Sequence, residues 1–331
     1  MNKSSEFDFS HHSPVTTVFV IPPSVHLLDI TGPAHVFYEA ADGGAPLELH
    51  YVSLHKNVSV ETSSGGLSFA ALEDFEKLTL KKDDIIFIPG LESHLLVSAP
   101  FLKEIDNFLR WLRAQQKIGV KICSVCTGAF IVAWSGVMEG HQATTHWKFQ
   151  ELMQQTFPGI QVLQNRLFVQ DGLLYSSAGV SSGIDLSLFL LGQMYGSRFS
   201  AAIAREIVIY LRRGAEDPQL SIFLQYRNHL EDRIHKVQEW LIQNLNKKVT
   251  ADFLSEMVHT SPRNLTRLFK DTTGITIGQY VEKLRVSHAL HLLQENQKVE
   301  QVARSCGLQS TNQLRTLLKK HAGILPTEIM S

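Results

Sequence analysis

The sequence predicts a two-domain protein: an α/β domain built on a parallel sheet with helices on both faces, followed by an all-α domain. Three observations lead to this prediction. Short apolar runs alternate with helical patterns from Val15 to about Gln193. From Leu230 onward, apolar residues recur every three or four positions without a strand pattern. The 331 residues are also enough to build two hydrophobic cores.

Four strands and two helices are expected in the first domain. The strands are TTVFVIPP (16–23), LELHYVSL (47–54), DIIFIPG (84–90) and KICSV (121–125). A helix over 101–116 is indicated by apolar residues at helical spacing, namely Phe101, Ile105, Phe108, Leu109 and Leu112. The strongly apolar stretch 183–196 predicts a further helix that covers the sheet.

A polar stretch, RRGAEDPQLS (212–221), divides the chain, because Gly214 and Pro218 interrupt the apolar pattern there. The expected organisation has four parts: a flexible N-terminus over 1–14, a first domain over 15–211, a linker over 212–229 and a helical domain over 230–331. Each domain then has an apolar pattern and a core of its own.

Composition indicates a soluble, cytoplasmic protein. Hydrophobic residues make up 44% and charged residues 19%, no apolar run reaches membrane-spanning length, and the first residues lack the apolar core of a signal peptide. The odd number of cysteines, Cys123, Cys126 and Cys306, indicates reduced thiols. There are 17 Lys and Arg against 22 Asp and Glu before residue 230, and 14 against 10 after it. The basic C-terminal part suits a polyanionic partner.

One helical unit occurs twice in the second domain. A shift of 49 residues aligns FLSEMVHTSPRNLTRLFKDTTGI (253–275) with VARSCGLQSTNQLRTLLKKHAGI (302–324). Each copy predicts a short helix, a tight turn, a serine N-cap and a second helix, with Ser261 and Ser310 as the caps. Between the copies, 275–294 predicts a long amphipathic helix. Its expected buried side chains are Ile277, Tyr280, Val281, Leu284 and Leu292.

The second helix of each copy leaves a polar face free, which predicts binding to DNA. In the first copy, Leu265, Leu268 and Phe269 take the buried positions. The outward side chains are Arg263, Asn264, Thr266, Arg267 and Lys270 in the first copy, and Thr311, Asn312, Gln313, Arg315 and Lys319 in the second. Such side chains form hydrogen bonds with base edges and phosphates, and a helix fits the major groove of DNA. A helical protein-interaction module that does not bind DNA is the alternative interpretation.

The stretch SPRNLTRLFKDTTGITIGQYVEKLRVSHALHLL resembles the AraC/XylS family of transcription regulators, and the resemblance covers about residues 230–328. It implies base-reading side chains in both copies: Arg263, Thr266 and Arg267, then Thr311, Asn312 and Arg315. The second copy departs from the family pattern, with leucines at 314 and 318 where many members have aromatics and Thr316 opposite Arg267. We therefore expect the first copy to contribute more of the specificity.

The most chemically distinctive segment of the first domain is SVCTGAF (124–130), a strand that turns sharply into a helix. Cys126 at such a turn lies at a helix N-terminus, whose N–H groups lower a thiol pKa, so it is a candidate nucleophile. GVSSG (179–183) fits the pattern of a serine hydrolase elbow. We expect instead that its glycines make a tight turn and that Ser181 and Ser182 cap a helix.

Several segments resemble, in order, the PfpI-like branch of the class I glutamine amidotransferase-like fold over roughly 15–195. Besides the cysteine segment they are HLLDITGPAHVF (26–37), FIPG (87–90), ATTHW (143–147) and DGLLYSSAG (171–179). The resemblance implies a flavodoxin-like sheet and a pocket at the cysteine, formed by Asp29, Gly90, Cys126, Thr127 and His146. Hydrolytic members commonly have a histidine where Thr127 stands, so this chain lacks the usual base.

Three interpretations of the pocket remain open. The residues form a non-catalytic effector pocket, or they are structural, with Cys126 filling a tight turn, Asp29 capping a helix and His146 bonded in the core. In the third, Cys126 is the nucleophile of a thiol-dependent hydratase or amidase with an appended DNA-binding domain. No metal or cofactor is expected, because the histidines are scattered and no paired metal motif occurs.

The two resemblances together are typical of the GlxA-like regulators, in which the enzyme-like domain senses small metabolites. They imply a transcription regulator that binds double-stranded promoter DNA and whose DNA affinity changes when a metabolite binds beside Asp29. The expected partners are an amine or amino-acid-like effector, a second copy in a homodimer, and RNA polymerase. No membrane partner is expected.

Overall fold

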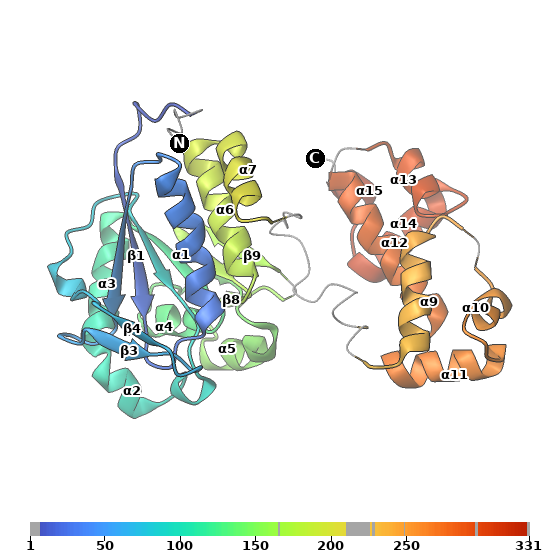
Figure 1. Cartoon of the computed structure of the whole chain (residues 1–331), viewed down its shortest axis with the longest axis horizontal. Coiled ribbons are helices and arrows are strands. Elements are labelled where there is room, and N and C mark those ends of the chain that lie inside the picture. Colours follow the sequence, from blue (N-terminus) through green and yellow to red (C-terminus); the bar gives the residue numbers. More distant parts are fainter. Residues whose placement is uncertain are drawn as a thin grey trace. The chain divides into compact units, whose positions relative to one another are not determined.

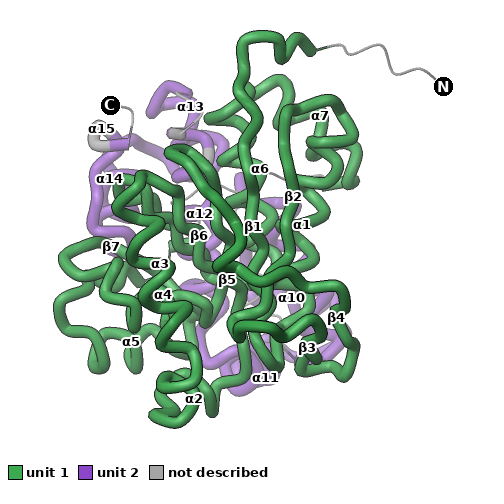
Figure 2. The backbone as a smooth tube through the Cα atoms, turned by 90° about the vertical axis from the view of Figure 1, so that its left-hand side faces the viewer, with its two compact units in different colours: residues 1–219 green, residues 220–331 purple. Residues whose placement is uncertain are grey.

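The computed structural model describes residues 7–164, 166–209, 226, 229–247, 249–294 and 297–329. The chain forms two compact units, residues 1–219 and 220–331 (Figure 2). Each unit has its own hydrophobic clusters. Most of the linker expected over 212–229 lies outside the described residues.

A six-stranded sheet forms the centre of unit 1, in the order β2-β1-β5-β6-β10-β9. The strands are β1 (Val15–Ile21), β2 (Leu47–Ser53), β5 (Ile85–Ile88), β6 (Lys121–Val125), β9 (Phe168–Asp171) and β10 (Leu174–Ser177). All neighbouring pairs are parallel except β9 with β10, at one edge. The four strands expected from the sequence are confirmed, and so is the α/β fold class.

Helices cover both faces of this sheet (Figure 1). One face carries α1 (Leu27–Asp42), α6 (Ser182–Tyr195) and α7 (Ser197–Glu206). The other carries α2 (Ala99–Glu104), α3 (Asp106–Ile118), α4 (Gly128–Trp134) and α5 (Gln150–Thr156). Side chains along β1 alternate between the two cores: Val18 and Val20 lie in one, Phe19 and Ile21 in the other. Both faces are therefore buried, as in parallel sheets generally.

The shorter elements lie around the rim of the sheet. They are strands β3 (Val60–Thr62), β4 (Ser68–Ala70), β7 (Gln142–Ala143) and β8 (Gln161–Val162), and the 3-10 helices η1 (Phe75–Lys77), η2 (Ser93–Leu95) and η3 (Trp147–Phe149). The single helix expected over 101–116 is wrong in one respect, because the backbone breaks at Ile105 between α2 and α3. Ile105 is fully buried, so the apolar spacing continues across the break.

Part of the N-terminus expected to be flexible packs on unit 1. The rings of Phe7 and Phe9 lie with their centroids 5.0 and 5.1 Å from that of Phe199, and Phe9 also meets Tyr195 edge-on at 5.4 Å. These contacts anchor the described residues that precede β1 against α6 and α7.

The described residues of unit 2 form helices joined by turns and contain no strand. Its helices are α9 (Asp232–Gln243), α10 (Ala251–Met257), α11 (Pro262–Thr273), α12 (Ile277–Gln294), α13 (Val299–Ser305), α14 (Thr311–Ala322) and α15 (Pro326–Ile329). The pairs α10–α11 and α13–α14 are the two copies of the repeat. Ser261 and Ser310 cap α11 and α14, each accepting an N–H at 3.3 Å, as expected. The all-α second domain is confirmed.

The connecting helix α12 has two buried faces where a single one was expected. Tyr280 and Leu284 belong to the cluster of the first copy, whereas Ala289 and Leu293 belong to that of the second. At about 100° per residue, the two pairs lie on roughly opposite sides of the helix. Leu292 therefore packs with the second copy and not on the face of Tyr280. No helix within the described residues is long and apolar enough to span a membrane.

Candidate functional site

Cys126 stands at a strained turn at the carboxyl end of β6. Its backbone is left-handed, with φ of 57°, which is uncommon for a residue other than glycine. The turn is held from both sides: the Cys126 N–H donates to the Ser177 carbonyl at 3.0 Å, and the Thr145 hydroxyl donates to the Cys126 carbonyl at 2.8 Å. Gly179 packs so closely that a Cβ there would lie 2.3 Å from the Cys126 Cβ. The sequence-predicted elbow is confirmed.

Asp29 faces this elbow from the first turn of α1. It is only 1% exposed. Its Oδ1 accepts the Val180 N–H at 2.5 Å, and its Oδ2 lies 3.4 Å from His26 Nδ1. Oδ2 accepts no hydrogen bond from the described residues. The ligand atoms of His26, Asp29 and Cys126 all lie within 4.8 Å of one another, and we call these three residues the elbow cluster.

Gly90 and Thr127 close the elbow cluster at the end of β5. A Cβ on Gly90 would lie 2.5 Å from Asp29 Oδ2 and 2.9 Å from Thr127 Oγ1, so only glycine fits. Thr127 is fully buried, and its hydroxyl donates to the Leu91 carbonyl and accepts the Leu91 N–H, both at 3.0 Å. Thr127 thus fastens the loop after β5 to the elbow.

His146 lies outside the elbow cluster, although the sequence placed it in the same pocket. It precedes η3, where its Nδ1 accepts the Lys148 N–H at 3.4 Å. Burial and the Lys148 charge lower the pKa of His146, against an opposing effect of Asp29. His146 is therefore within electrostatic range of Asp29, while the imidazole that pairs with Asp29 belongs to His26.

The thiol of Cys126 is held in its protonated form. Burial raises its pKa well above the usual value and the Asp29 charge raises it further, whereas the Thr127 N–H acts in the opposite direction. The expectation of a lowered pKa is wrong, because desolvation and the nearby Asp29 carboxylate outweigh the hydrogen bonding from Thr127 at the start of α4. The contact with the Asp29 carboxylate raises the pKa of His26.

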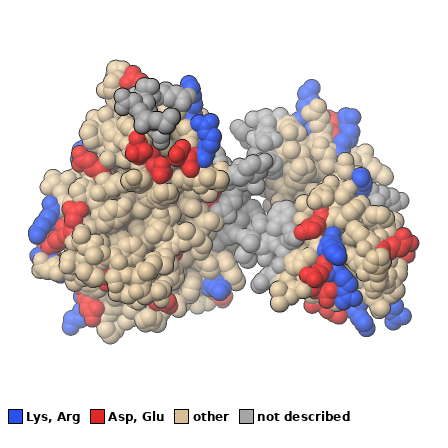
Figure 3. Space-filling view, viewed as in Figure 1, with Lys and Arg blue, Asp and Glu red and all other residues tan. Residues whose placement is uncertain are grey.

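The polar faces of α11 and α14 are open to solvent. All five outward residues expected in the first copy are exposed, as are four of the five in the second; Thr311 is half-buried. Some of these groups are already bonded: the Thr266 hydroxyl donates to the Pro262 carbonyl, and Gln313 Oε1 accepts the Gln309 N–H at 2.8 Å. On the visible face of unit 2, Lys and Arg side chains are interspersed with acidic ones (Figure 3).

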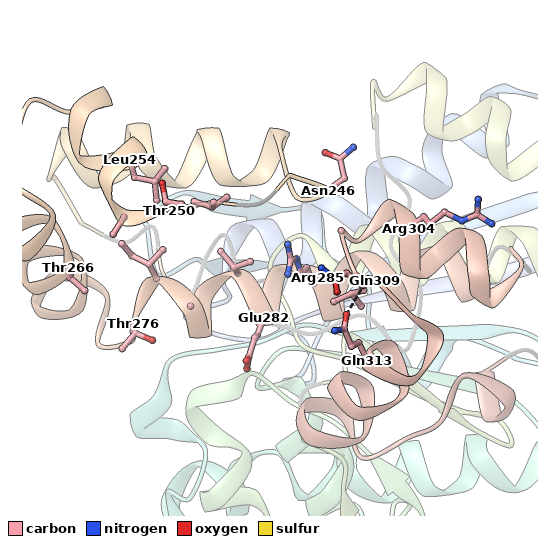
Figure 4. A pocket seen from close by; sticks show the side chains of 17 residues that line it. Asn246, Thr250, Leu254, Thr266, Thr276, Glu282, Arg285, Arg304, Gln309 and Gln313 are labelled. Carbon is pink, nitrogen blue, oxygen red and sulfur yellow. Dashed lines mark hydrogen bonds between the residues drawn. The ribbon is translucent and has the colours of Figure 1, made fainter.

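A groove of about 910 Å³ runs along α12 between the two copies (Figure 4). Thr266 on α11 and Gln313 on α14 line it from opposite ends, with Glu282 and Arg285 of α12 between them. The groove therefore lies between the two helices that were expected to read DNA.

Comparison with known proteins places both units. Residues 15–193, more than half of the chain, match the DJ-1/PfpI family. The chain belongs to the DJ-1/PfpI family. Residues 254–331 match a helix-turn-helix domain. The crystal structure of a putative transcriptional regulator protein from Vibrio parahaemolyticus shares the fold with a TM-score of 0.52 at 21% identity, covering 59% of this chain and all of that one.

Two curated relatives represent two kinds of protein. The HTH-type transcriptional regulator GbdR of Pseudomonas aeruginosa is 30% identical over 220 residues, which is 66% of this chain and 59% of GbdR. The isonitrile hydratase of Pseudomonas putida is 32% identical over 178 residues, 54% of this chain and 71% of the hydratase. The alignment with GbdR thus spans less than two thirds of that protein.

Sequence reasoning missed three residues of this DJ-1/PfpI site: His26, Gly179 and Val180. His26 begins the HLLDITG segment and lies one helical turn before Asp29, so its position relative to Asp29 was a usable signal. Gly179 has φ of 93° and makes the expected tight turn, but its approach to Cys126 depends on packing between distant segments. Of the two serines expected to cap α6, Ser181 stands at the N-cap without a side-chain bond to the helix.

The elbow cluster has the nitrogen, oxygen and sulfur donors that could hold a metal ion. Tetrahedral ligands around zinc lie about 3.3–3.8 Å apart, closer than the outer limit of this cluster. The absence of a metal stays a prediction.

Proposed function

We propose that the protein is a sequence-specific DNA-binding transcription regulator, controlled by a small metabolite that binds in a non-catalytic DJ-1/PfpI domain. The observation that carries the proposal is the repeated helix-turn-helix unit with two solvent-exposed polar faces. The name of GbdR supports it. Each recognition helix is capped by serine and packed through buried leucines, so its outer face is free to enter a major groove.

The two faces are unequal in arginine. Arg263 and Arg267 are exposed on α11, whereas α14 presents one arginine, Arg315, with Thr316 in the place of Arg267. Arginine makes the commonest bidentate contact with guanine. The first copy therefore supplies more of the base discrimination, and the second adds mainly phosphate contacts.

The elbow cluster suits a cationic effector. Asp29 is buried, and His26 Nδ1 lies 3.4 Å from its Oδ2 without a hydrogen bond of good geometry, so this oxygen can still accept from a better-placed donor. An ammonium group would donate to this oxygen with a charge-assisted bond. Amines and amino-acid-like metabolites are therefore the effector class. The bound metabolite would shift DNA affinity by favouring one of two states of the protein.

Further parts of the proposal rest on the sequence and the relatives. They are the domain limits 15–211 and 230–331, a homodimer, a cytoplasmic location and contact with RNA polymerase. Gel filtration with light scattering tests the dimer, which predicts twice the mass of 37.2 kDa.

Selection of bound duplexes from a random DNA pool tests the DNA-binding part. The full chain should enrich a two-part consensus whose parts lie about one helical turn, roughly 34 Å, apart. Arg267→Ala should weaken binding by about 1–3 kcal/mol and relax one part of the consensus. Thr316→Ala, at the matching position of the second copy, is the control and should change affinity less than about threefold. No enrichment, or equal effects of both variants, would contradict the proposal.

Calorimetric titration with a panel of amines, amino acids and quaternary ammonium compounds tests the effector. Asp29→Asn should abolish binding, whereas Arg267→Ala should leave it intact. The active compound should also change the affinity for the selected duplex. A compound that binds at Asp29 but leaves DNA affinity unchanged would remove the sensor function and leave the DNA-binding function standing.

A thiol-dependent hydratase is the second candidate function, favoured by the similarity to isonitrile hydratase and by His26 in the elbow cluster. Against it, the contact with Asp29 favours the protonated imidazole of His26, which cannot accept the thiol proton. Turnover of an isonitrile, nitrile or amide panel, lost in both Cys126→Ala and His26→Ala, would establish it.

A further inference from the structure

Arg285 ties α12 to the segment that precedes the first helix-turn-helix copy. Its side chain is half-buried, and its Nε and Nη2 both donate to the Leu245 carbonyl, at 3.3 and 3.1 Å. Leu245 follows α9 and leads toward α10. The guanidinium thus spans from the connecting helix to the first copy, and two donors on one acceptor fix its orientation.

The second copy meets the same point through Gly307, in the turn between α13 and α14. Gly307 has φ of 67°, and a Cβ there would lie 2.6 Å from the Leu245 carbonyl oxygen and 3.0 Å from Arg285 Nη2. The neighbouring thiol of Cys306 donates to the Arg285 carbonyl at 3.5 Å. Backbone from the segment before the first copy and from the turn of the second copy therefore converges on one arginine, and we call Leu245, Arg285 and Gly307 the junction.

One turn earlier on α12, Glu282 makes a second tie, to the end of α14. Its Oε2 accepts from Lys320 Nζ at 2.7 Å and from His321 Nε2 at 2.8 Å. This pair is partly exposed and is worth little by itself. The junction is packed backbone to backbone, so it is the more rigid of the two ties.

We propose that Arg285 is the positioning residue that sets the distance and angle between α11 and α14, and thereby the spacing of the two parts of the DNA site. The inference rests on the proposed DNA-binding function. Without the junction, the two copies stay joined by α12 but lose a fixed orientation. Two modules on a loose connection still bind together, with a lower effective concentration and a wider range of tolerated spacings.

Affinity measurements on three duplexes test the proposal. The duplexes are the selected two-part site, the same site with one base pair inserted between its parts, and a site that retains only the part read by α11. Wild type should lose at least about tenfold on insertion. Arg285→Ala should bind the two-part site about tenfold more weakly, lose less than about threefold on insertion, and bind the single part unchanged. Arg285→Lys, which keeps the charge but has a single donor nitrogen in place of the guanidinium fork, should lie between the two.

The controls separate positioning from direct contact. If Arg285 instead held a phosphate, Arg285→Ala would weaken the single-part and two-part sites alike or lower the salt slope by about one, and the proposal would be overturned. Arg304→Ala removes an exposed cation from the same groove. Among the described residues, Arg304 Nε donates within α13, to the Glu300 carbonyl, so this variant should leave the insertion penalty unchanged. Unaltered helical circular dichroism of each variant confirms that it folds.

A distance measurement without DNA distinguishes failure of this inference from failure of the DNA-binding function. Spin labels on Lys270→Cys and Lys319→Cys occupy equivalent exposed positions of the two copies, while the three native cysteines are buried. Pulsed electron paramagnetic resonance should give a narrow distribution of distances between the two labels, which broadens in Arg285→Ala and not in Arg304→Ala. An unchanged distribution overturns the inference. If the distance distribution broadens in Arg285→Ala but the protein binds no DNA, the proposed DNA-binding function is contradicted and the positioning role of Arg285 still stands.

Discussion

Alkylation of Cys126 by iodoacetamide measures whether the elbow thiol is available for chemistry. The thiolate is the reacting form. Burial and the Asp29 charge raise the pKa of this thiol well above its ordinary value, so the thiolate is a minor form at neutral pH. Cys126 is also only 3% exposed. Thiolate fraction and access both lower the rate, and we expect alkylation at least about tenfold slower than that of a free cysteine.

The pH dependence of the alkylation rate shows whether a raised thiol pKa is the cause of the slow reaction. The alkylation rate, followed by mass spectrometry of the peptide that contains Cys126, should rise continuously to pH 9 without reaching a plateau. Asp29→Asn removes a charge that raises the thiol pKa and should therefore speed the reaction at a given pH. Cys126→Ala controls for labelling at the two other buried cysteines. A rapid burst at neutral pH, with an apparent pKa below 8, would refute this reasoning and favour the hydratase.

Three further outcomes are expected from the structure. Gly179→Ala should lower the unfolding free energy by about 3 kcal/mol, because φ of 93° and the contact with Cys126 both oppose a methyl group. Gly172→Ala is the control, since a Cβ there meets no other atom, and it should lower the unfolding free energy by about 1 kcal/mol. Thermal unfolding measures both variants. Ser261→Ala should cost about 1 kcal/mol through the lost cap of α11, measured in urea; no change would argue against the cap. The His26 pKa should lie above 6.5 by NMR titration and fall in the Asp29→Asn variant, and its stabilising effect, full below the unfolded pKa, should fade as pH rises through the folded value.

Sequence patterns predicted the regular parts of the fold well, because each buried strand or helix face has its own apolar period. The same reasoning failed where one apolar pattern is compatible with two different structures. The break at Ile105 is invisible, since both helices pack on the same core. The two faces of α12 were merged into one, because a helix between two cores has apolar residues all round.

The site was predictable in its residues but less so in its chemistry. The resemblance correctly brought Asp29, Gly90 and Cys126 together. Asp29 lies in the first turn of α1, Gly90 follows β5 and Cys126 follows β6. The thiol pKa was wrong because it depends on burial and on Asp29, nearly a hundred residues away along the chain. His26 was missed because its pairing with Asp29 becomes meaningful only once both face the elbow.

The affinity of the full chain for its selected duplex at two salt concentrations tests the central claim most directly. Five cationic side chains stand in the expected DNA-binding set: Arg263, Arg267, Lys270, Arg315 and Lys319. If all five contact phosphates, a fourfold rise in salt from about 50 to 200 mM should weaken binding by up to about 500-fold. Binding that falls steeply in this way supports a regulator that reads DNA through unit 2. Binding that is absent at 50 mM salt, or independent of salt, would contradict it.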